Sequence, residues 1–156
     1  MTAREATRNP ESYKRPESVL VVVYTRGGEV LLLQRADATE AWQSVTGSMR
    51  WDEKEPVDTA HRELFEETGL VAGDLLKDPG VKNRYPIHPL WKPRYHPDQH
   101  ENCEHLFFLE LPERSVITLN SSEHQNFCWL PFRQALGKVR FSTNRDAIEM
   151  LMKSKP

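Results

Sequence analysis

Residues 19–24 read Val-Leu-Val-Val-Val-Tyr, a continuously apolar and largely β-branched run. Such a run is typical of a strand that is buried on both faces, because a half-exposed strand alternates apolar and polar residues. Gly27-Gly28 follows as a turn signal, and residues 30–33 are apolar again, which predicts that the two segments form a hairpin. We therefore expect a central sheet that is covered on both sides.

The rest of the chain supplies the covering elements. Pro56 fits the first turn of a helix in which Val57, Ala60 and Leu64 keep helical spacing and form the expected buried stripe. A last helix is expected with Thr143 as its N-cap. Further strands are expected at residues 42–46, 104–111 and 127–130, and an irregular insert at residues 74–102. These elements predict an α/β (α+β) fold, a mixed β-sheet sandwiched between α-helices.

Composition places the chain among ordinary single-domain proteins. The 156 residues are 38% hydrophobic, with 21 basic and 23 acidic side chains and a net charge of −2. This balance argues against a partner nucleic acid, and no apolar stretch approaches the roughly 20 residues that span a membrane. Two cysteines and a polar start favour a cytoplasmic protein. We expect a disordered tail at residues 1–12 and one domain at 13–156, as a monomer or homodimer.

The first of these helices ends in a cluster of like charges. Glu63, Glu66 and Glu67 stand at relative positions i, i+3 and i+4, so their carboxylates can share one face and repel each other. Gly69 is expected to end the helix, which places these acids at the negative end of its macrodipole. A hard cation such as Mg²⁺ would offset both costs, because such ions take carboxylate oxygens. The alternative is a solvated acidic face with Arg62 as a partial counterion.

The residues around this cluster resemble a known family. Gly47, an acidic loop and the run Arg62-Glu63-Leu64-x-Glu66-Glu67-x-Gly69-Leu70 are similar to the Nudix box, G-x5-E-x7-R-E-U-x-E-E-x-G-U, where U is apolar. Outside the box, four segments resemble the bacterial dihydroneopterin triphosphate pyrophosphohydrolases of this family. They are Tyr13-Lys14-Arg15-Pro16, Trp42 to Ser48, Glu123-His124 before Trp129-Leu130, and Ser142 to Glu149. The similarity covers nearly the whole chain from Tyr13 onward.

One position departs from the family pattern. The first Glu of the box stands seven residues before the Arg, whereas Glu53 leaves eight residues, 54–61, before Arg62. The extra residue lies in the loop between Gly47 and the helix. In the family this Glu is a partner of the Arg rather than a main metal ligand, and the sequence leaves that role open between Glu53 and Glu55.

The resemblance implies a Mg²⁺-dependent hydrolase, with Mn²⁺ as the alternative ion. Metal ligation is implied for four carboxylates and one backbone carbonyl, those of Glu63, Glu66, Glu67, Glu123 and Gly47. A glycine at this last position lets the backbone approach the ion closely. The implied catalytic acids are Glu66, Glu67 and Glu123. The identity of the general base stays open between Glu67 and Glu123, and Glu104 is a third, weaker candidate.

The resemblance also implies which residues contact the substrate: Lys14, Arg35, Thr46 and Asn144. Ordinary structural explanations stay open, such as a solvated lysine or a strand-end arginine. The insert fits a lid, to which Arg94 and Tyr95 would belong. In that lid Trp91 could stack on a pterin or purine ring, or instead pack the insert onto the domain. His96, His100, Cys103 and His105 suit zinc poorly, because they offer one thiol at irregular spacing.

Three functions are compatible with these residues. The leading hypothesis is cleavage of dihydroneopterin triphosphate to the monophosphate and pyrophosphate, a folate-pathway step. The second is a pyrophosphohydrolase of (deoxy)nucleoside triphosphates such as dATP, because purine and pterin rings have similar shapes and hydrogen-bonding edges. The third is a module that senses a nucleotide without turnover. The three retained acids of the helix favour catalysis.

Overall fold

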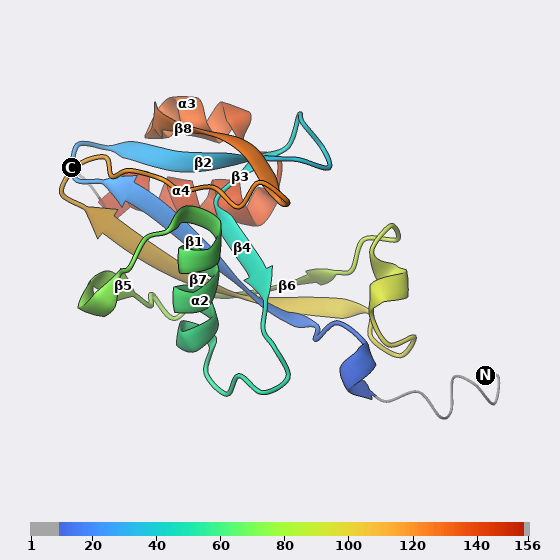
Figure 1. The fold of residues 1–156 in the computed structure, drawn as a ribbon. Helices are drawn as coiled ribbons and strands as arrows, with labels where there is room; N and C mark the ends of the chain where they lie inside the picture. The colour runs from blue at the N-terminus through green and yellow to red at the C-terminus, as the bar shows by residue number, and fades with distance from the viewer. Residues whose placement is uncertain (1–9, 155–156) are drawn as a thin grey trace.

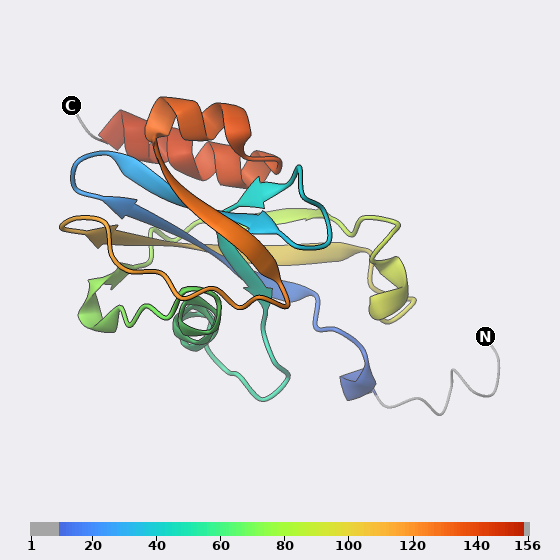
Figure 2. The same ribbon diagram turned by 45° about the horizontal axis from the view of Figure 1, so that its top comes forward.

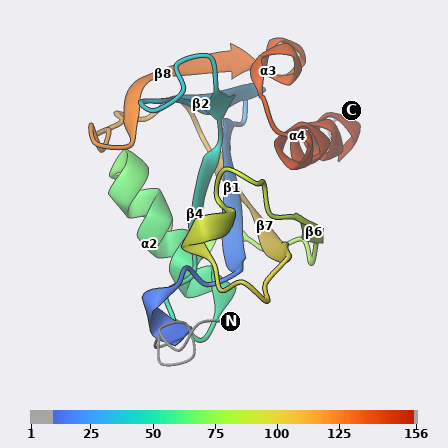
Figure 3. The ribbon, with the colours of Figure 1, turned by 90° about the vertical axis from the view of Figure 1, so that its right-hand side faces the viewer.

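The computed structural model describes residues 10–154 as one mixed β-sheet with helices on both faces (Figure 1). The elements, in chain order, are η1 (Pro10–Ser12), β1 (Glu17–Thr25), β2 (Glu29–Arg35), β3 (Trp42–Gln43), β4 (Val45–Ser48), α2 (Pro56–Thr68), η2 (Gly73–Leu75), β5 (Leu76–Lys77), β6 (Lys82–Pro86), η3 (Lys92–Arg94), β7 (Glu101–Leu111), β8 (His124–Pro131), α3 (Phe132–Lys138) and α4 (Ser142–Ser154). Figures 2 and 3 show α2 on one face of the sheet and α3 and α4 on the other. The expected sandwich is confirmed.

The central strand, β1, pairs with three neighbours. It runs parallel to β7 from the Glu17–Cys103 pair to the Thr25–Leu111 pair. On its other edge the end of the strand pairs with β2 in the predicted hairpin, whereas residues 18–21 pair with β4. The neighbour of β1 therefore changes from β4 to β2 along its length, and α2 packs beside the β4 half.

The apolar run of β1 separates two cores. Val19, Val21 and Val23 pack on the α2 side of the sheet, in a cluster that includes Leu64. Leu20 and its alternating neighbours pack on the opposite side, in the cluster that holds α4. Burial on both faces explains why this strand shows no polar alternation. No helix within residues 10–154 is long and apolar enough to cross a membrane.

The single strand expected at residues 42–46 is two strands in the structure. β3 pairs with β2, whereas β4 pairs with β1, so the chain crosses between neighbours at Ser44. The backbone N–H of Ser44 donates to Oδ1 of Asn144 at 2.8 Å, and the Asn144 amide donates to the Ser44 hydroxyl at 2.9 Å. A partner 100 residues away thus satisfies the backbone where the ladder is interrupted.

Other expectations differ in detail. The insert at residues 74–102 contains β6, which pairs with β7, so it is less irregular than its proline content indicates. A helix that the sequence pattern did not predict, α3, lies between β8 and α4. The last helix begins at Ser142, one residue before the expected N-cap. Residues 1–9 of the expected tail lie outside the described residues, and Pro10–Ser12 forms a 3-10 turn.

Candidate active site

The acidic face of α2 is turned toward the sheet. Pro56 occupies the first turn as expected, and Gly69 ends the helix in the left-handed conformation with φ of 77°, which is natural only for glycine. The expected buried stripe is wrong at Val57, which is 38% exposed. Glu63 and Glu67 are buried instead, at 8% and 1% exposure. The helix therefore gives part of its inward face to carboxylates rather than to apolar side chains.

Glu63 lies directly against the backbone of Gly47. A Cβ added to Gly47 would stand 2.1 Å from Cδ of Glu63 and 2.3 Å from its Oε1, closer than any real contact. Gly47 pairs with Val19 across β1 and β4, which places it on the α2 side of the sheet. The glycine is therefore required here for space, because it leaves room for the carboxylate.

Glu67 lies beside the last residues of the loop that leads into β8. Its Oε1 is 3.4 Å from Nδ1 of His124, and ligand atoms of Glu67, Glu123 and His124 all lie within 4.8 Å of one another. The backbone N–H of Thr46 also bonds the Glu67 carboxylate. Glu67 Oε2 is buried and has no hydrogen-bond partner in the described structure. Glu123 itself is exposed.

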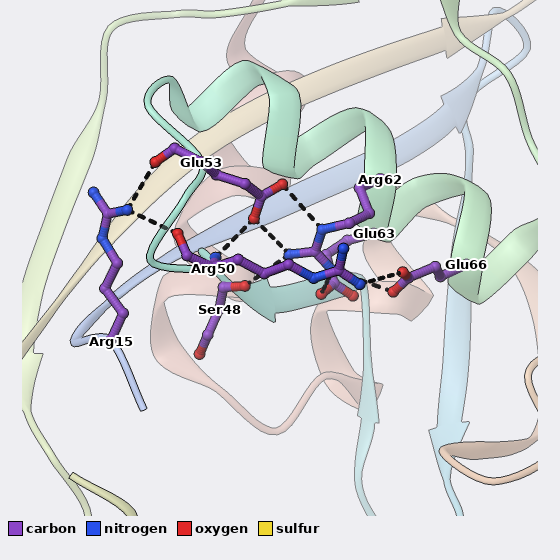
Figure 4. A network of polar contacts seen from close by, with 7 residues as sticks. All are labelled: Arg15, Ser48, Arg50, Glu53, Arg62, Glu63 and Glu66. Carbon is purple, nitrogen blue, oxygen red and sulfur yellow. Dashed lines mark hydrogen bonds and ion pairs between the residues drawn. The ribbon is translucent and has the colours of Figure 1, made fainter. Parts of the chain in front are cut away.

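Arg62 connects the acids of the helix to the preceding loop (Figure 4). Its guanidinium donates to both oxygens of Glu53, through Nε at 3.0 Å and Nη2 at 2.8 Å. It also donates through Nη1 to Glu63 at 2.8 Å and to Glu66 at 3.2 Å. Glu53, and not Glu55, is therefore the partner of the arginine, even though eight residues separate the two.

The longer loop is held by the N-terminal segment. Arg15 donates through Nη1 to the carbonyls of Arg50 and Glu53, at 2.9 and 2.8 Å, and through Nη2 to Glu17 at 2.8 Å. Figure 4 shows Arg15 reaching the loop from the segment just before β1. The carboxylate of Glu53 also accepts the backbone N–H of Arg50 at 2.7 Å. These contacts accommodate the extra residue without moving Glu53 away from Arg62.

Replacing Glu53 with Gln should destabilise the protein in a pH-dependent way. Arg62 lowers the pKa of Glu53 from 4.5 to about 2, so the ion pair stabilises the fold above pH 4.5 and that contribution is lost as pH falls toward 2. We expect a loss of about 2 kcal/mol at pH 7 that shrinks toward pH 3, measured by thermal unfolding. Glu55→Gln is the control in the same loop, and equal losses in both variants would contradict the assignment.

Burial makes the acidic cluster costly to ionise. It raises the pKa of Glu63 to about 7, with Arg62 opposing the rise, and it raises the pKa of Glu67 well above its usual value. Repulsion from Glu63 and Glu123 raises the pKa of Glu67 further. A divalent cation fits this donor set, because it would neutralise the crowded carboxylates and take the unpartnered oxygen of Glu67.

Basic side chains surround the acids. Burial lowers the pKa of Lys14, and the charges of Arg94 and Arg35 lower it further. The charges of Glu63 and Glu123 oppose this shift. Each of these four charged groups is therefore close enough to Lys14 to influence it. Three cations beside an acidic cluster form a site suited to a polyphosphate whose cation is held by the acids.

The other substrate positions have structural partners. The Thr46 hydroxyl donates a hydrogen bond to the carbonyl of Val19 at 3.0 Å, and the backbone N–H of Thr46 faces the Glu67 carboxylate. Asn144 is 1% exposed and its amide is engaged by Ser44. Arg35 makes a bidentate pair with Asp37, both contacts at 2.7 Å, and keeps Nη1 near Gln43.

Glu104 lies away from this cluster. It follows the alternation of β7, so it shares the α4 face of the sheet with Leu106, whereas Glu63 and Glu67 lie on the α2 face. Its carboxylate accepts the Tyr85 hydroxyl at 3.0 Å. The base candidates therefore reduce to Glu67 and Glu123.

Trp91 of the insert packs against residues of the domain. The ring centroid of Trp91 lies 5.8 Å from the Arg35 guanidinium and 6.5 Å from the Phe141 ring, so this indole already packs on the domain. Within residues 10–154, His96, His100, Cys103 and His105 do not form a group of converging metal ligands. His105 instead contacts Glu17 at 2.7 Å.

Two side chains of the site were not singled out from the sequence. His124 and Gln43 are 2% and 3% exposed and touch each other next to Glu67. Both stand in segments that carry the family resemblance, but 81 positions separate them. Only the pairing of β2 with both β3 and β8 brings them together.

Comparisons with known proteins agree with this geometry. The NUDIX domain model matches residues 14–151. The chain is 38% identical over 141 residues to dihydroneopterin triphosphate diphosphatase of Haemophilus influenzae, covering 88% of this chain and 87% of that protein. It is 38% identical over 144 residues to the Escherichia coli protein of the same name, covering 90% and 94%. The solved structure of the E. coli dihydroneopterin triphosphate pyrophosphohydrolase superimposes with a TM-score of 0.80 at 37% identity, covering 88% and 95%. The chain belongs to the Nudix family of hydrolases.

Proposed function

We propose that this protein is a Mg²⁺-dependent pyrophosphohydrolase that converts dihydroneopterin triphosphate to dihydroneopterin monophosphate and pyrophosphate. As a Nudix hydrolase it is an enzyme that acts on phosphoanhydrides. The proposal depends on one observation above others: the carboxylates of Glu63 and Glu67 are both buried on the face of α2 that packs against the sheet. The substrate is inferred from the two relatives that carry that name over most of both chains.

The acids of α2 would hold the cation. Glu63, Glu67 and Glu123 are suitable side-chain ligands, with the backbone of Gly47 against Glu63 and Glu66 at the exposed edge. When bound, a divalent cation neutralises charge on the phosphates and lowers the pKa of water. Arg62 keeps Glu63 in place and balances part of its charge.

The remaining roles follow from exposure and charge. Lys14, Arg35 and Arg94 would bind the phosphate oxygens that the acids leave unneutralised. We assign the general base to Glu123, because an exposed carboxylate can exchange its proton with solvent after each turnover. Glu67, which is buried, is assigned to ligation.

A substrate panel tests the function. Dihydroneopterin triphosphate, dATP, GTP and a dinucleoside polyphosphate are incubated with the protein and Mg²⁺, and release of pyrophosphate and orthophosphate is followed separately. We expect the highest kcat/KM for the pterin, with pyrophosphate as the product. A preference for dATP would replace the substrate, and no metal-dependent turnover of any compound would favour a nucleotide-sensing module.

Stabilisation by Mg²⁺ should grow with pH. The pKa of Glu63 is raised to about 7, so the metal-free fold holds this proton more tightly than the unfolded chain does. Without metal, protonated Glu63 therefore stabilises the fold at low pH. This contribution is lost as pH rises from about 4.5, the pKa of Glu63 in the unfolded chain, through 7, its pKa in the fold. The cation competes with that proton, so we expect Mg²⁺ to raise Tm more at pH 8 than at pH 6. The Glu63→Gln variant should show a smaller gain at both values, and a pH-independent gain in the unmodified protein would count against the assignment.

A further inference from the structure

Two buried side chains connect the proposed phosphate-binding arginine to the proposed metal ligand Glu67. Arg35 Nη1 is 3.5 Å from Oε1 of Gln43. Gln43 Nε2 is 3.3 Å from Nε2 of His124, and His124 Nδ1 is 3.4 Å from Oε1 of Glu67. Three consecutive contacts thus run from a cation to a carboxylate.

The donors fix the orientation of the glutamine. A guanidinium only donates hydrogen bonds, so Gln43 must present its carbonyl oxygen to Arg35. Its NH₂ group then faces His124, and the reverse orientation would bring two donors together at the arginine. Because Gln43 is 3% exposed, solvent does not offer it another partner.

The orientation of Gln43 determines which ring nitrogen of His124 carries the proton. A ring nitrogen that faces an amide N–H must present a lone pair, so Nε2 of His124 is the acceptor. The ring is then neutral and carries its proton on Nδ1. That nitrogen is buried and makes no hydrogen bond in the described structure, and Oε1 of Glu67 lies 3.4 Å from it. The contact is long for a hydrogen bond, as catalytic contacts often are before a substrate binds.

We infer that His124 is a positioning residue, which Gln43 holds in the Nδ1–H tautomer so that it donates to Glu67 and orients this carboxylate. The inference rests on the proposed function in one respect only, the role given to Glu67. Donation from His124 to Glu67 would also couple Arg35 to Glu67, because each contact fixes the polarity of the next. Indirect support of a ligand typically changes activity by about 10 to 100-fold.

The tautomer can be measured without any activity. Long-range ¹H–¹⁵N correlation spectra of the full-length protein, with the His124 signals assigned by comparison with His124→Asn, report which ring nitrogen carries the proton. We expect Nδ1–H in the unmodified protein. In Gln43→Glu, which keeps the shape of the side chain but presents only acceptor oxygens, the proton should move to Nε2. A ring already protonated at Nε2 in the unmodified protein would overturn the inference.

Matched substitutions of His124 test the donation to Glu67. Asparagine places an N–H close to the position of Nδ1, whereas glutamine places it close to that of Nε2. We expect His124→Asn to keep kcat within several-fold and His124→Gln to lower kcat by about 10 to 100-fold, with KM little changed in both. Equal activity in the two variants, with equal Tm, would show a packing role only. If the substrate panel finds no turnover, the proposed function fails, while the spectra still decide the tautomer.

Discussion

Glu67→Gln is expected to abolish turnover while the fold stays intact. The substitution keeps the shape of the side chain and removes the charge that we assign to metal ligation, at a residue that is 1% exposed. Loss of several kcal/mol of transition-state stabilisation corresponds to a fall in kcat of about 10³-fold. The measurement is pyrophosphate release from dihydroneopterin triphosphate under saturating substrate and Mg²⁺.

The stability of this variant should move in the opposite direction. Burial and the neighbouring Glu63 and Glu123 make the charged form of Glu67 costly, so a neutral amide relieves repulsion in the metal-free protein. Its Tm without metal should therefore equal or exceed that of the unmodified protein at pH 8. Asp58→Asn, an exposed acid in the first turn of the same helix, is the control and should keep kcat. Near-normal turnover by Glu67→Gln would refute the ligand assignment.

Gly47→Ala is expected to damage both activity and stability. The added methyl group would stand 2.1 Å from Cδ of Glu63, and Arg62 holds that carboxylate in place through a hydrogen bond of 2.8 Å. The side chain must leave its place, and a displacement of about 1 Å at a reacting centre can lower kcat by about 100-fold. Overpacking of this kind costs about 2 kcal/mol of unfolding free energy. Steady-state kinetics and denaturant unfolding measure the two effects.

A second glycine provides the matched control. A Cβ added to Gly137, in α3, would meet no atom within 4 Å. Alanine should therefore be neutral there or stabilise by about 0.5–1 kcal/mol, because glycine is a poor helix former. Similar losses from both substitutions would mean that the space beside Glu63 is not what requires Gly47.

The sequence predicted the elements that are defined by local pattern. The hairpin, the start of α2 and the glycine that ends it are all set by neighbours within a few residues. The buried face of α2 could not be predicted from local pattern, because a prediction from hydrophobic spacing places carboxylates on the solvent-exposed face. Glu63 and Glu67 are buried although they are charged, whereas the apolar Val57 is 38% exposed.

Contacts between distant segments cannot be predicted from local sequence pattern. The partner of Arg62 depends on how the longer loop folds, and Arg15 fixes that fold from outside the box. The burial of His124 against Gln43 depends on β3 and β8, two strands that pair with opposite edges of β2. Neither contact has a signal in local spacing, although each residue lies in a segment with a family resemblance.

The bond between Asn144 and Ser44 ties the far end of the chain to the reaction centre. Ser44 stands three residues before Gly47, and its backbone is held by the first turn of α4 rather than by a neighbouring strand. Fraying of α4 from its first turn would therefore leave the backbone of Ser44 without this partner, directly before the strand β4 that carries Gly47. The two Asn144–Ser44 bonds thus couple the C-terminal helix to the strand segment that leads to Gly47.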